Sequence, residues 1–299
     1  MRVFITGASG FVGGFLGRHL RESGDVVVDP FVDLSDTAAL WHAIAAARPD
    51  AIYHLAGQAD VGRSWDTPSE TYQINTIGTA NVIEGAARAG TNPTVLIVSS
   101  GEVYGRVETA DLPVTEEHAL RPTTPYGASK AAAELVALQA FWGRSLPVIV
   151  ARPFNHIGPG QSDAFVVSAL ARQIAEAERD PARDLCVGNL AAARDFSDVR
   201  DVVRAYRACV SQGTPGRVYN VCSGVAVPIR DVVDRLLAMA RRPIRMTVDP
   251  SRVRAVDVAE VRGDASRVRA DTAWVPVHGL DEGLAAVLDW WRIRVTEAA

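Results

Sequence analysis

The sequence predicts an α/β protein built on a Rossmann-type, doubly wound parallel sheet with a smaller C-terminal lobe. Short apolar, β-branched runs alternate with longer helical segments through the first half of the chain, which is the pattern of βα units in a parallel sheet. In addition, a glycine-rich turn, Gly7 to Gly13, directly follows the first apolar run, residues 2–6. A turn of this kind is typical of the first βα connection in such sheets.

The individual elements follow from the apolar pattern. We expect strands at 2–6, 26–28, 51–55, 95–99 and 147–151, and helices over 14–22, 35–47, 69–89 and 126–143. The segment between Val28 and Ser35 is unusually short. We therefore expect the second crossover of the sheet to be reduced or missing.

The second half of the chain has a mixed pattern. Residues 195–202 and 218–221 are expected to return to the main sheet, whereas 164–180 and the region after Pro228 form a smaller cap. No stretch rich in proline, glycine and serine separates the two parts, so we expect one folding unit with a cleft between its lobes. The expected sheet domain comprises residues 1–155, with 195–222 returning to it, and the smaller lobe comprises residues 156–194 and 223–299.

The glycine-rich turn predicts a dinucleotide site. Gly7 permits a tight turn, Gly10 lets the backbone approach phosphate groups, and Gly13 allows the helix to pack closely on the strand. The helix that follows presents its N-terminus, where free backbone N–H groups favour a diphosphate. The spacing G-x-x-G-x-x-G is one residue wider than the fingerprint of the large dehydrogenases.

Tyr126 and Lys130 indicate proton-transfer chemistry. They are four positions apart in an expected helix, so their side chains share one face. Because a nearby ammonium favours phenolate, we expect Lys130 to lower the pKa of the Tyr126 phenol. A serine at the preceding strand end, Val98-Ser99-Ser100, can hold a substrate oxygen while the phenol gives or takes a proton. The alternative is an ordinary amphipathic helix with an exposed lysine.

The composition excludes several classes of function. The 299-residue chain is 48% apolar, enough for a full core, and its net charge of −4 gives no general attraction to nucleic acid or anionic membrane. No window reaches the roughly 18 apolar residues of a membrane span, and glycines interrupt the N-terminal apolar run, so no membrane segment or signal peptide is predicted. Three widely spaced cysteines indicate reduced thiols in the cytoplasm. The six histidines lack paired metal-ligand spacing, so no metal site is predicted.

Several motifs together resemble those of the extended short-chain dehydrogenases/reductases, in the NAD-dependent epimerase/dehydratase family that modifies nucleotide sugars. They occur in the order of that family and span essentially the whole chain. The matching runs are Thr6-Gly-Ala-Ser-Gly-Phe-Val-Gly13, His54-Leu-Ala-Gly57, Asn75, Ser99-Ser-Gly-Glu-Val-Tyr-Gly105, Tyr126-x-x-x-Lys130 and Arg152-Pro-Phe-Asn155.

The resemblance implies roles for individual residues. Ser100, four positions before Tyr104, matches the catalytic Ser or Thr of the family, with Tyr126 and Lys130 as its partners. Glu102 matches the acid that removes a proton from sugar C5 in family dehydratases, and a structural or substrate-hydroxyl contact is its alternative role. The residues implied in coenzyme binding are Gly7, Ser9, Gly10, Phe11, Val12, Gly13, Asp29, Asp33, Leu34, Leu55, Ala56, Gly57, Asn75, Ser99, Tyr126, Lys130 and Pro153.

The coenzyme is expected to be NAD(H) or NADP(H). Asp29 follows the second expected strand, where a carboxylate can hydrogen-bond a ribose diol and repel a 2′-phosphate. This favours NAD(H) by a small margin, and an ordinary turn aspartate is the alternative. Asp33 and Leu34 match the adenine-contacting Asp-Leu of the family, and His54 is expected to be packed rather than catalytic.

The second half of the chain indicates the substrate class. Arg152-Pro-Phe-Asn-His-Ile-Gly-Pro-Gly-Gln161 and Ala193-Arg-Asp-Phe-Ser-Asp198 resemble runs of the family branch that reduces GDP-linked 4-keto-6-deoxy sugars. The resemblance implies that Asn155, Arg194 and Arg254 bind the nucleoside diphosphate, because arginine forms bidentate bonds to phosphate. Otherwise each arginine is a solvated surface charge.

The resemblance therefore implies an oxidoreductase. The expected reaction is hydride transfer from NAD(P)H to the C4 ketone of a GDP-4-keto-6-deoxyhexose, giving GDP-D-rhamnose or a close relative, with Tyr126 as proton donor. A 4,6-dehydratase or 4-epimerase that retains its coenzyme is the alternative, and a non-catalytic coenzyme sensor is a third. The family also implies a homodimer through a four-helix interface made by segments 69–89 and 126–143, unless both simply pack on the parent sheet.

Overall fold

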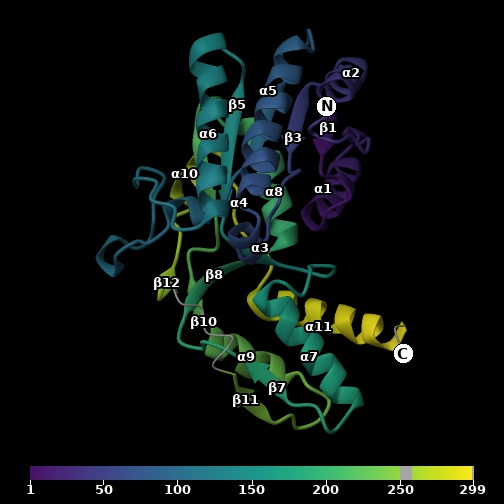
Figure 1. Ribbon diagram of the computed structural model, residues 1–299, viewed down its shortest axis with the longest axis vertical. Coiled ribbons are helices and arrows are strands. Elements are labelled where there is room, and N and C mark those ends of the chain that lie inside the picture. The colour runs from purple at the N-terminus through teal and green to yellow at the C-terminus, as the bar shows by residue number, and fades with distance from the viewer. Residues whose placement is uncertain (250–257, 298–299) are drawn as a thin grey trace.

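The structure, a computed structural model, describes residues 1–249 and 258–297. A parallel sheet between two layers of helices forms its larger part, and a smaller lobe lies below that part in Figure 1. The elements of the first half are β1 (Arg2–Thr6), α1 (Phe11–Glu22), β2 (Val26–Val28), α2 (Thr37–Ala47), β3 (Ala51–His54), α3 (Val61–Asp66), α4 (Pro68–Tyr72), the π-helical turn η1 (Gln73–Ile77), α5 (Gly78–Arg88), β4 (Thr94–Val98), the short 3₁₀ turns η2 (Gly101–Tyr104) and η3 (Thr109–Asp111), α6 (Pro125–Arg144) and β5 (Val148–Pro153). Those of the second half are β6 (Asn155–Ile157), α7 (Val166–Arg179), β7 (Leu185–Val187), β8 (Ala193–Asp198), α8 (Val199–Gln212), β9 (Val218–Val221), β10 (Ala226–Pro228), α9 (Ile229–Ala238), β11 (Met246–Val248), β12 (Glu260–Val261), α10 (Ser266–Thr272) and α11 (Leu280–Glu297).

The main sheet confirms the predicted Rossmann-type fold. Its six strands are parallel and lie in the order β2-β1-β3-β4-β5-β9. Because β1 lies between β2 and β3, the strand order reverses there, and ligands of such sheets bind at the carboxyl ends beside this point. Helix α2 carries the chain from β2 across β1 to β3, so the second crossover is present, contrary to the expectation. In the part of the chain that the structure describes, no strand lies outside β2.

Side chains alternate between two apolar layers along each strand. Val3 and Ile5 of β1 belong to the core layer that includes α1 and α8, whereas Phe4 belongs to the layer that includes α2, α5 and α6. Strand β4 divides in the same way, with Leu96 on the first side and Ile97 on the other. A strand buried on both faces has no polar face, which is why these strands are continuous apolar runs in the sequence.

The segment expected to return to the main sheet, residues 195–222, divides in the structure. Strand β9 joins the sheet beside β5, as predicted. Strand β8 does not, because β9 already occupies that edge of β5, and β8 pairs instead with β6, β10 and β12. The lobe has its own core, formed mainly by α7, α9 and α11. None of the described helices combines the length and apolarity of a membrane span.

Candidate active site

The carboxyl edge of the main sheet brings most of the predicted site residues together. The glycine-rich turn follows β1, residues 55–57 follow β3, Ser99 and Ser100 follow β4, and Pro153 ends β5. Parallel strands end on the same side, so these segments face one crevice. Helix α6 begins at this edge, because the Thr124 hydroxyl accepts the Gly127 backbone N–H at 3.0 Å and Pro125 occupies the first turn.

The glycine-rich turn fits a dinucleotide diphosphate. Gly7 has a φ of +76°, and a Cβ on Gly13 would lie 2.1 Å from the Gly7 carbonyl oxygen, so the turn is a close backbone cradle that side chains would fill. Gly10 stands at the start of α1, and no side chain caps the helix there. The free N–H groups of its first turn are therefore available to an anion. The Phe11 ring of the same turn stacks on His156, with ring centroids 6.1 Å apart.

His54 is a packed residue, as predicted. Its Nδ1 lies 2.7 Å from the Thr6 hydroxyl and its Nε2 lies 2.9 Å from the Thr79 hydroxyl. Burial, together with the positive charge of Lys130, lowers the pKa of His54 to about 3, so the ring stays neutral. The neutral ring ties β1 and α5 to the end of β3, and residues 55–57 continue from it into the crevice, where they are partly accessible.

Two residues predicted to bind coenzyme have side chains occupied within the protein. Asn75, in the π-helical turn, bonds the backbone N–H and carbonyl of Gln58 at 2.8 and 3.0 Å and the Ser129 hydroxyl at 2.9 Å. Leu34 is buried in the core, where its Cδ1 would lie 2.8 Å from a Cβ on Gly78. Asn75 and Leu34 therefore help to build the crevice by holding neighbouring parts of the protein in place.

The two predicted aspartates lie after β2. Asp33 is exposed, and its Oδ1 accepts the backbone N–H and the hydroxyl of Ser35, each at 2.8 Å, which lowers the pKa of its carboxyl. Asp29 directly follows the strand, and its Oδ2 accepts a 2.6 Å bond from Nη2 of Arg21 on α1. Sequence reasoning missed this arginine, which places a positive charge beside the Asp29 carboxylate.

Tyr126 is 8% exposed, and its interacting neighbours Ser100 and Glu102 follow β4 in the chain. Burial raises the pKa of its phenol to about 12, and the charge of Glu102 acts in the same direction. The Ser100 side chain lies within hydrogen-bonding reach of the phenol and lowers its pKa in part. The structure thus differs from the expected acidified phenol, because burial of the phenol and the charge of Glu102 together outweigh the Ser100 hydrogen bond.

Lys130 lies one turn further along α6 and is 9% exposed. Its ammonium donates to the Val98 carbonyl at 2.8 Å, so it is fixed at the end of β4 rather than exposed. Burial lowers the pKa of Lys130 to about 8, and the negative charge of Glu134 opposes this shift.

Ser99 and Ser100 have different roles. Ser99 is 2% exposed and donates its hydroxyl hydrogen bond to Glu134 inside the protein. Ser100 begins the η2 turn, accepts the Glu102 backbone N–H at 3.2 Å and is partly accessible. Of the two serines, Ser100 is therefore the more accessible one.

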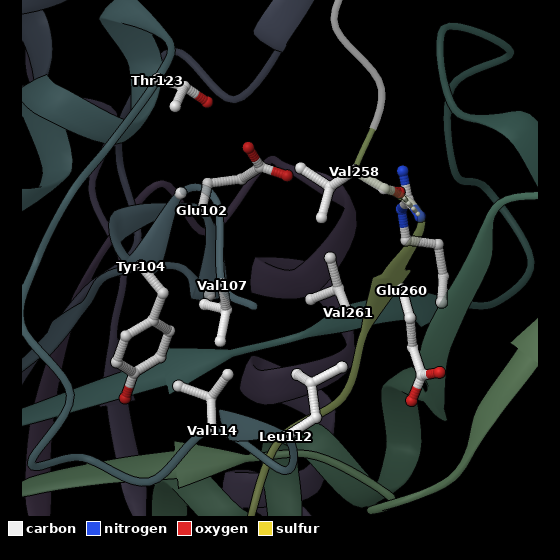
Figure 2. Close-up of a pocket in the computed structure, with 12 residues that line it drawn as sticks. Glu102, Tyr104, Val107, Leu112, Val114, Thr123, Val258, Glu260 and Val261 are labelled. Carbon is white, nitrogen blue, oxygen red and sulfur yellow. Dashed lines mark hydrogen bonds between the residues drawn. The ribbon is translucent and has the colours of Figure 1, made fainter. Parts of the chain in front are cut away.

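A pocket lies between the two lobes beside Ser100. Its lining includes Glu102 and Tyr104 of η2, Thr123, Arg194 of β8, and Val258, Glu260 and Val261 (Figure 2). In the close-up, the Glu102 carboxylate extends between Thr123 and Val258. Nη1 of Arg194 donates to the Val258 carbonyl at 2.7 Å, so this predicted phosphate ligand is held in the pocket wall.

Of the other two predicted substrate residues, the structure describes Asn155, which is not brought into this pocket. Asn155 is exposed at the start of β6 and is absent from the described lining, and Arg254 lies outside the described residues. Sequence reasoning also missed Thr123 and Glu260, because a pocket wall built from two distant segments leaves no local pattern. Within the described residues, no group of His, Cys, Asp and Glu side chains is arranged to hold a metal ion.

Sequence reasoning missed the buried ion pair between Glu134 and Arg152, which also contacts Ser99 at the end of β4. Glu134 accepts from Nε and Nη2 of Arg152 at 2.9 and 2.6 Å. Arg152 also donates to the Tyr104 hydroxyl at 2.9 Å, and that hydroxyl donates to Asn220 at 2.6 Å. One signal for it was available in the sequence: Glu134 is four positions after Lys130, as Lys130 is after Tyr126.

A nucleotide-binding sheet that carries Ser, Tyr and Lys at its carboxyl edge defines a short-chain dehydrogenase/reductase, which is a class of oxidoreductase. A family model described as GDP-mannose 4,6 dehydratase matches residues 30–287. The chain belongs to this nucleotide-sugar-modifying family of extended short-chain dehydrogenases/reductases.

Known relatives are similar over the whole chain. The GDP-6-deoxy-D-mannose reductase of Pseudomonas aeruginosa is 41% identical, over 99% of each chain. The solved structure of RMD from Pseudomonas aeruginosa complexed with NADPH has a TM-score of 0.92 and 40% identity, covering 98% of this chain and 99% of that one. The UDP-glucose 4-epimerase of Thermus thermophilus, solved in complex with NAD, has a TM-score of 0.88 and 25% identity, covering 98% of this chain and 99% of that one.

Proposed function

We propose that the protein reduces the C4 ketone of a GDP-linked 4-keto-6-deoxyhexose, GDP-4-dehydro-6-deoxy-D-mannose, to GDP-D-rhamnose with NAD(P)H. The observation that carries this proposal is the Ser100, Tyr126 and Lys130 set beside a pocket between the lobes. The similarity to the Pseudomonas aeruginosa reductase supports the choice of sugar and reaction.

The residues have separate tasks in this reaction. When bound, NAD(P)H supplies the hydride to C4. The Ser100 hydroxyl donates a hydrogen bond to the ketone oxygen, which stabilises the charge that develops there. The Tyr126 phenol gives its proton to that oxygen, and the Lys130 ammonium stabilises the phenolate that is left.

The protonation state of Tyr126 supports the reductive direction. With a pKa of about 12, the phenol keeps its proton at neutral pH and is ready to act as an acid. Oxidation would need the phenolate at the start of the reaction. The buried Lys130 ammonium is one helical turn away. It stabilises the negative charge of the phenolate, and this charge exists only once the proton is leaving.

We also propose that the two lobes bind different ligands. Residues 1–155, with 195–222, bind the coenzyme, and residues 156–194 and 223–299 bind the nucleotide sugar. Arg194 supports this division, because it lines the pocket from β8 opposite Glu102. Asn155 and Arg254 are the other proposed substrate ligands.

The choice of coenzyme rests on Asp29. We propose a small preference for NAD(H), because a carboxylate at the end of β2 hydrogen-bonds a ribose diol and repels a 2′-phosphate. Arg21 donates a hydrogen bond to Asp29. Its guanidinium favours NADP(H) instead, because a guanidinium binds phosphate. The relative solved with NADPH makes this preference the first point to test.

We further propose that the protein is a cytoplasmic homodimer. All three cysteines are free thiols, which suits a reducing compartment. Exposed apolar side chains on α6, Leu135 and Trp142, support an interface through α5 and α6. Of the small residues on these helices, Gly78, Ala86, Ala131 and Ala133 are buried within the subunit, so they serve packing on the parent sheet.

A dehydratase or epimerase that retains its coenzyme is the second proposal. Glu102 favours it, because its carboxylate enters the pocket beside Thr123, where a base for a sugar C–H would be needed (Figure 2). A retained coenzyme returns its hydride, so this activity turns over without added NADH or NADPH.

One assay separates the two proposals. Purified protein is mixed with GDP-4-keto-6-deoxymannose and NADH or NADPH, and the nicotinamide absorbance is followed. We expect one coenzyme to be consumed per product, and the Glu102→Gln variant to keep most of that activity. Turnover of GDP-mannose without added coenzyme, lost in Glu102→Gln, would support the dehydratase instead.

A further inference from the structure

A buried carboxylate connects the catalytic helix to the catalytic strand. Glu134 is 1% exposed and lies on α6 one turn beyond Lys130. It accepts the Ser99 hydroxyl, and Ser99 is flanked by Val98, whose carbonyl accepts the Lys130 ammonium, and by Ser100. One carboxylate therefore fixes the strand end that leads into Ser100 and whose Val98 carbonyl accepts the Lys130 ammonium.

Arg152 makes this carboxylate rigid. Two parallel bonds, from Nε at 2.9 Å and Nη2 at 2.6 Å, hold both oxygens of Glu134. Arg152 is itself fixed by the Tyr104 hydroxyl at 2.9 Å, so neither partner of the ion pair can rotate freely. Since Arg152 lies in β5, the pair also ties the neighbouring strand to α6.

The titratable groups around Lys130 come from three elements. Helix α6 contributes Tyr126 and Glu134, strand β3 contributes the neutral ring of His54, and strand β5 contributes Arg152 on the other side of Glu134. Of these groups, Glu134 is the anion that favours the charged lysine, while burial disfavours it. Without Glu134, the buried Lys130 ammonium and the buried Arg152 guanidinium would both lose the anion that favours their charged forms.

We propose that Glu134 is a positioning residue: anchored by Arg152, it supplies the counter-charge of the Lys130 ammonium and orients the strand end that carries Ser100. This inference rests on the proposed function, because it assigns a role within the same Ser–Tyr–Lys site. Glu134 touches neither substrate nor coenzyme and acts only through Lys130 and Ser99.

The test is the pH dependence of kcat for the purified full-length enzyme. Lys130, with a pKa of about 8, loses its charge as the pH rises, so wild-type kcat should decline above pH 8. In Glu134→Gln the decline should move to lower pH by at least about one unit, because the anion that favours the ammonium is gone. At pH 8 this corresponds to a kcat lower by at least roughly fivefold, with the sugar KM changed less than about threefold.

A matched control is available in the lobe. Glu178 of α7 forms the same two-bond pair with Arg292 of α11, at 2.9 and 2.6 Å, far along the chain from the site. Glu178→Gln should lower the melting temperature without moving the pH profile. Glu134→Asp keeps the charge, so its alkaline decline should stay within a few tenths of a pH unit of wild type.

A second variant tests the same inference when the single substitution prevents folding. If Glu134→Gln does not fold, the double variant Glu134→Gln with Arg152→Gln removes both charges and leaves no unpaired buried cation. It should fold and show the same acid shift of the decline. A wild-type profile that stays flat to about pH 9.5, or a folded variant with an unshifted decline, would overturn the inference.

The proposed function fails separately. If Tyr126→Phe keeps near-normal reduction, the Ser–Tyr–Lys assignment itself is wrong. If Tyr126→Phe is inactive but Glu134→Gln has the wild-type profile, only the role of Glu134 is lost.

Discussion

Tyr126 illustrates how position in the fold decides the chemistry of a single side chain. Its phenol is covered by the protein, and burial raises its pKa to about 12, although a lysine is one helical turn away. That ammonium bonds the Val98 carbonyl and is itself partly disfavoured by burial. At neutral pH the phenol therefore keeps its proton, which is the state that the proposed reduction requires.

We predict that Tyr126→Phe lowers kcat for reduction by at least about a hundredfold, because it removes the proton donor and leaves the packing unchanged. The measurement is steady-state oxidation of NADH or NADPH with the keto sugar. Tyr53→Phe is the matched control: Tyr53 is equally buried, and its hydroxyl has no hydrogen-bond partner in the described part of the chain. Its kcat should stay within about twofold of wild type.

Asp29 and Arg21 should control coenzyme selection in opposite directions. We predict that Asp29→Asn raises kcat/KM for NADPH relative to NADH by at least about tenfold, because it removes a charge that repels the 2′-phosphate. Arg21→Gln should shift the ratio toward NADH. The ratio is measured with both coenzymes at saturating sugar. Equal ratios in all three proteins would show that these side chains lie away from the 2′ position.

At the scale of elements, the β1–α1 turn is a part of the site with little tolerance for change. A Cβ on Gly13 would lie 2.1 Å from the Gly7 carbonyl oxygen and 2.7 Å from Ala8 Cα, and both are backbone atoms that cannot move independently. The adjacent Gly14 has nothing within 4 Å of its ideal Cβ and is exposed. One helix turn thus contains both a position that requires glycine and one that does not.

We predict opposite effects for the two substitutions. Gly13→Ala should destabilise the fold by about 1–3 kcal/mol through overpacking and weaken coenzyme binding at least tenfold. Gly14→Ala should stabilise it by about 0.5–1 kcal/mol, since alanine favours an exposed helix position. Denaturant unfolding and a coenzyme fluorescence titration measure both quantities. Full coenzyme affinity in Gly13→Ala would contradict the assigned diphosphate cradle.

Elements with a local signal were predictable from the sequence. Helix α6 was expected over 126–143 and is observed at Pro125–Arg144, and β1 was expected and observed over residues 2–6. Helix 69–89 was wrong in detail, because the chain forms α4, a π-helical turn and α5 there. The extra residue of the π-helical turn directs Asn75 inward to its buried partners, a tertiary contact that periodicity does not record.

Contacts between distant segments set the limit of prediction for the site. Ser100, Tyr126 and Lys130 lie in motifs, so their grouping followed from the sequence. The pKa of the phenol, the Glu134–Arg152 pair and the pocket wall at residues 258–261 depend on burial and on which strand ends meet. Strand β8 was assigned to the wrong sheet for the same reason, since its apolar pattern fits either edge.

At the scale of the whole molecule, one buried carboxylate joins the lobe to the main sheet. Asp195 of β8 accepts the N–H and hydroxyl of Ser223 at 2.8 and 2.6 Å and the N–H of Gly224 at 2.9 Å. The Gly263 N–H adds a longer bond at 3.3 Å. Ser223 lies just beyond β9, so these bonds connect the strand that carries Arg194 to the end of a strand of the main sheet. The pocket that Arg194 lines therefore lies beside a buried polar contact between the two parts of the molecule.

The exposed apolar face of α6 provides the last prediction. Leu135 and Trp142 are 60% and 67% exposed and are seven positions apart, so they lie on one face of the helix. Large apolar side chains in such a row mark an interface, and a twofold dimer would pair α5 and α6 with their copies as four helices. The double variant Leu135→Glu with Trp142→Glu should be monomeric, because it buries carboxylates in that contact.

Light scattering after gel filtration measures the mass directly. Wild type should have twice the mass expected of the 299-residue chain, and the double variant should have the mass of one chain. Ile293→Glu is the control, because Ile293 is 60% exposed on α11 in the lobe, so that variant should remain dimeric. Since Ser100, Tyr126 and the pocket all come from a single chain, the monomer should keep its sugar KM within about threefold. A monomeric wild type, or a double variant that still dimerises, would place the contact elsewhere.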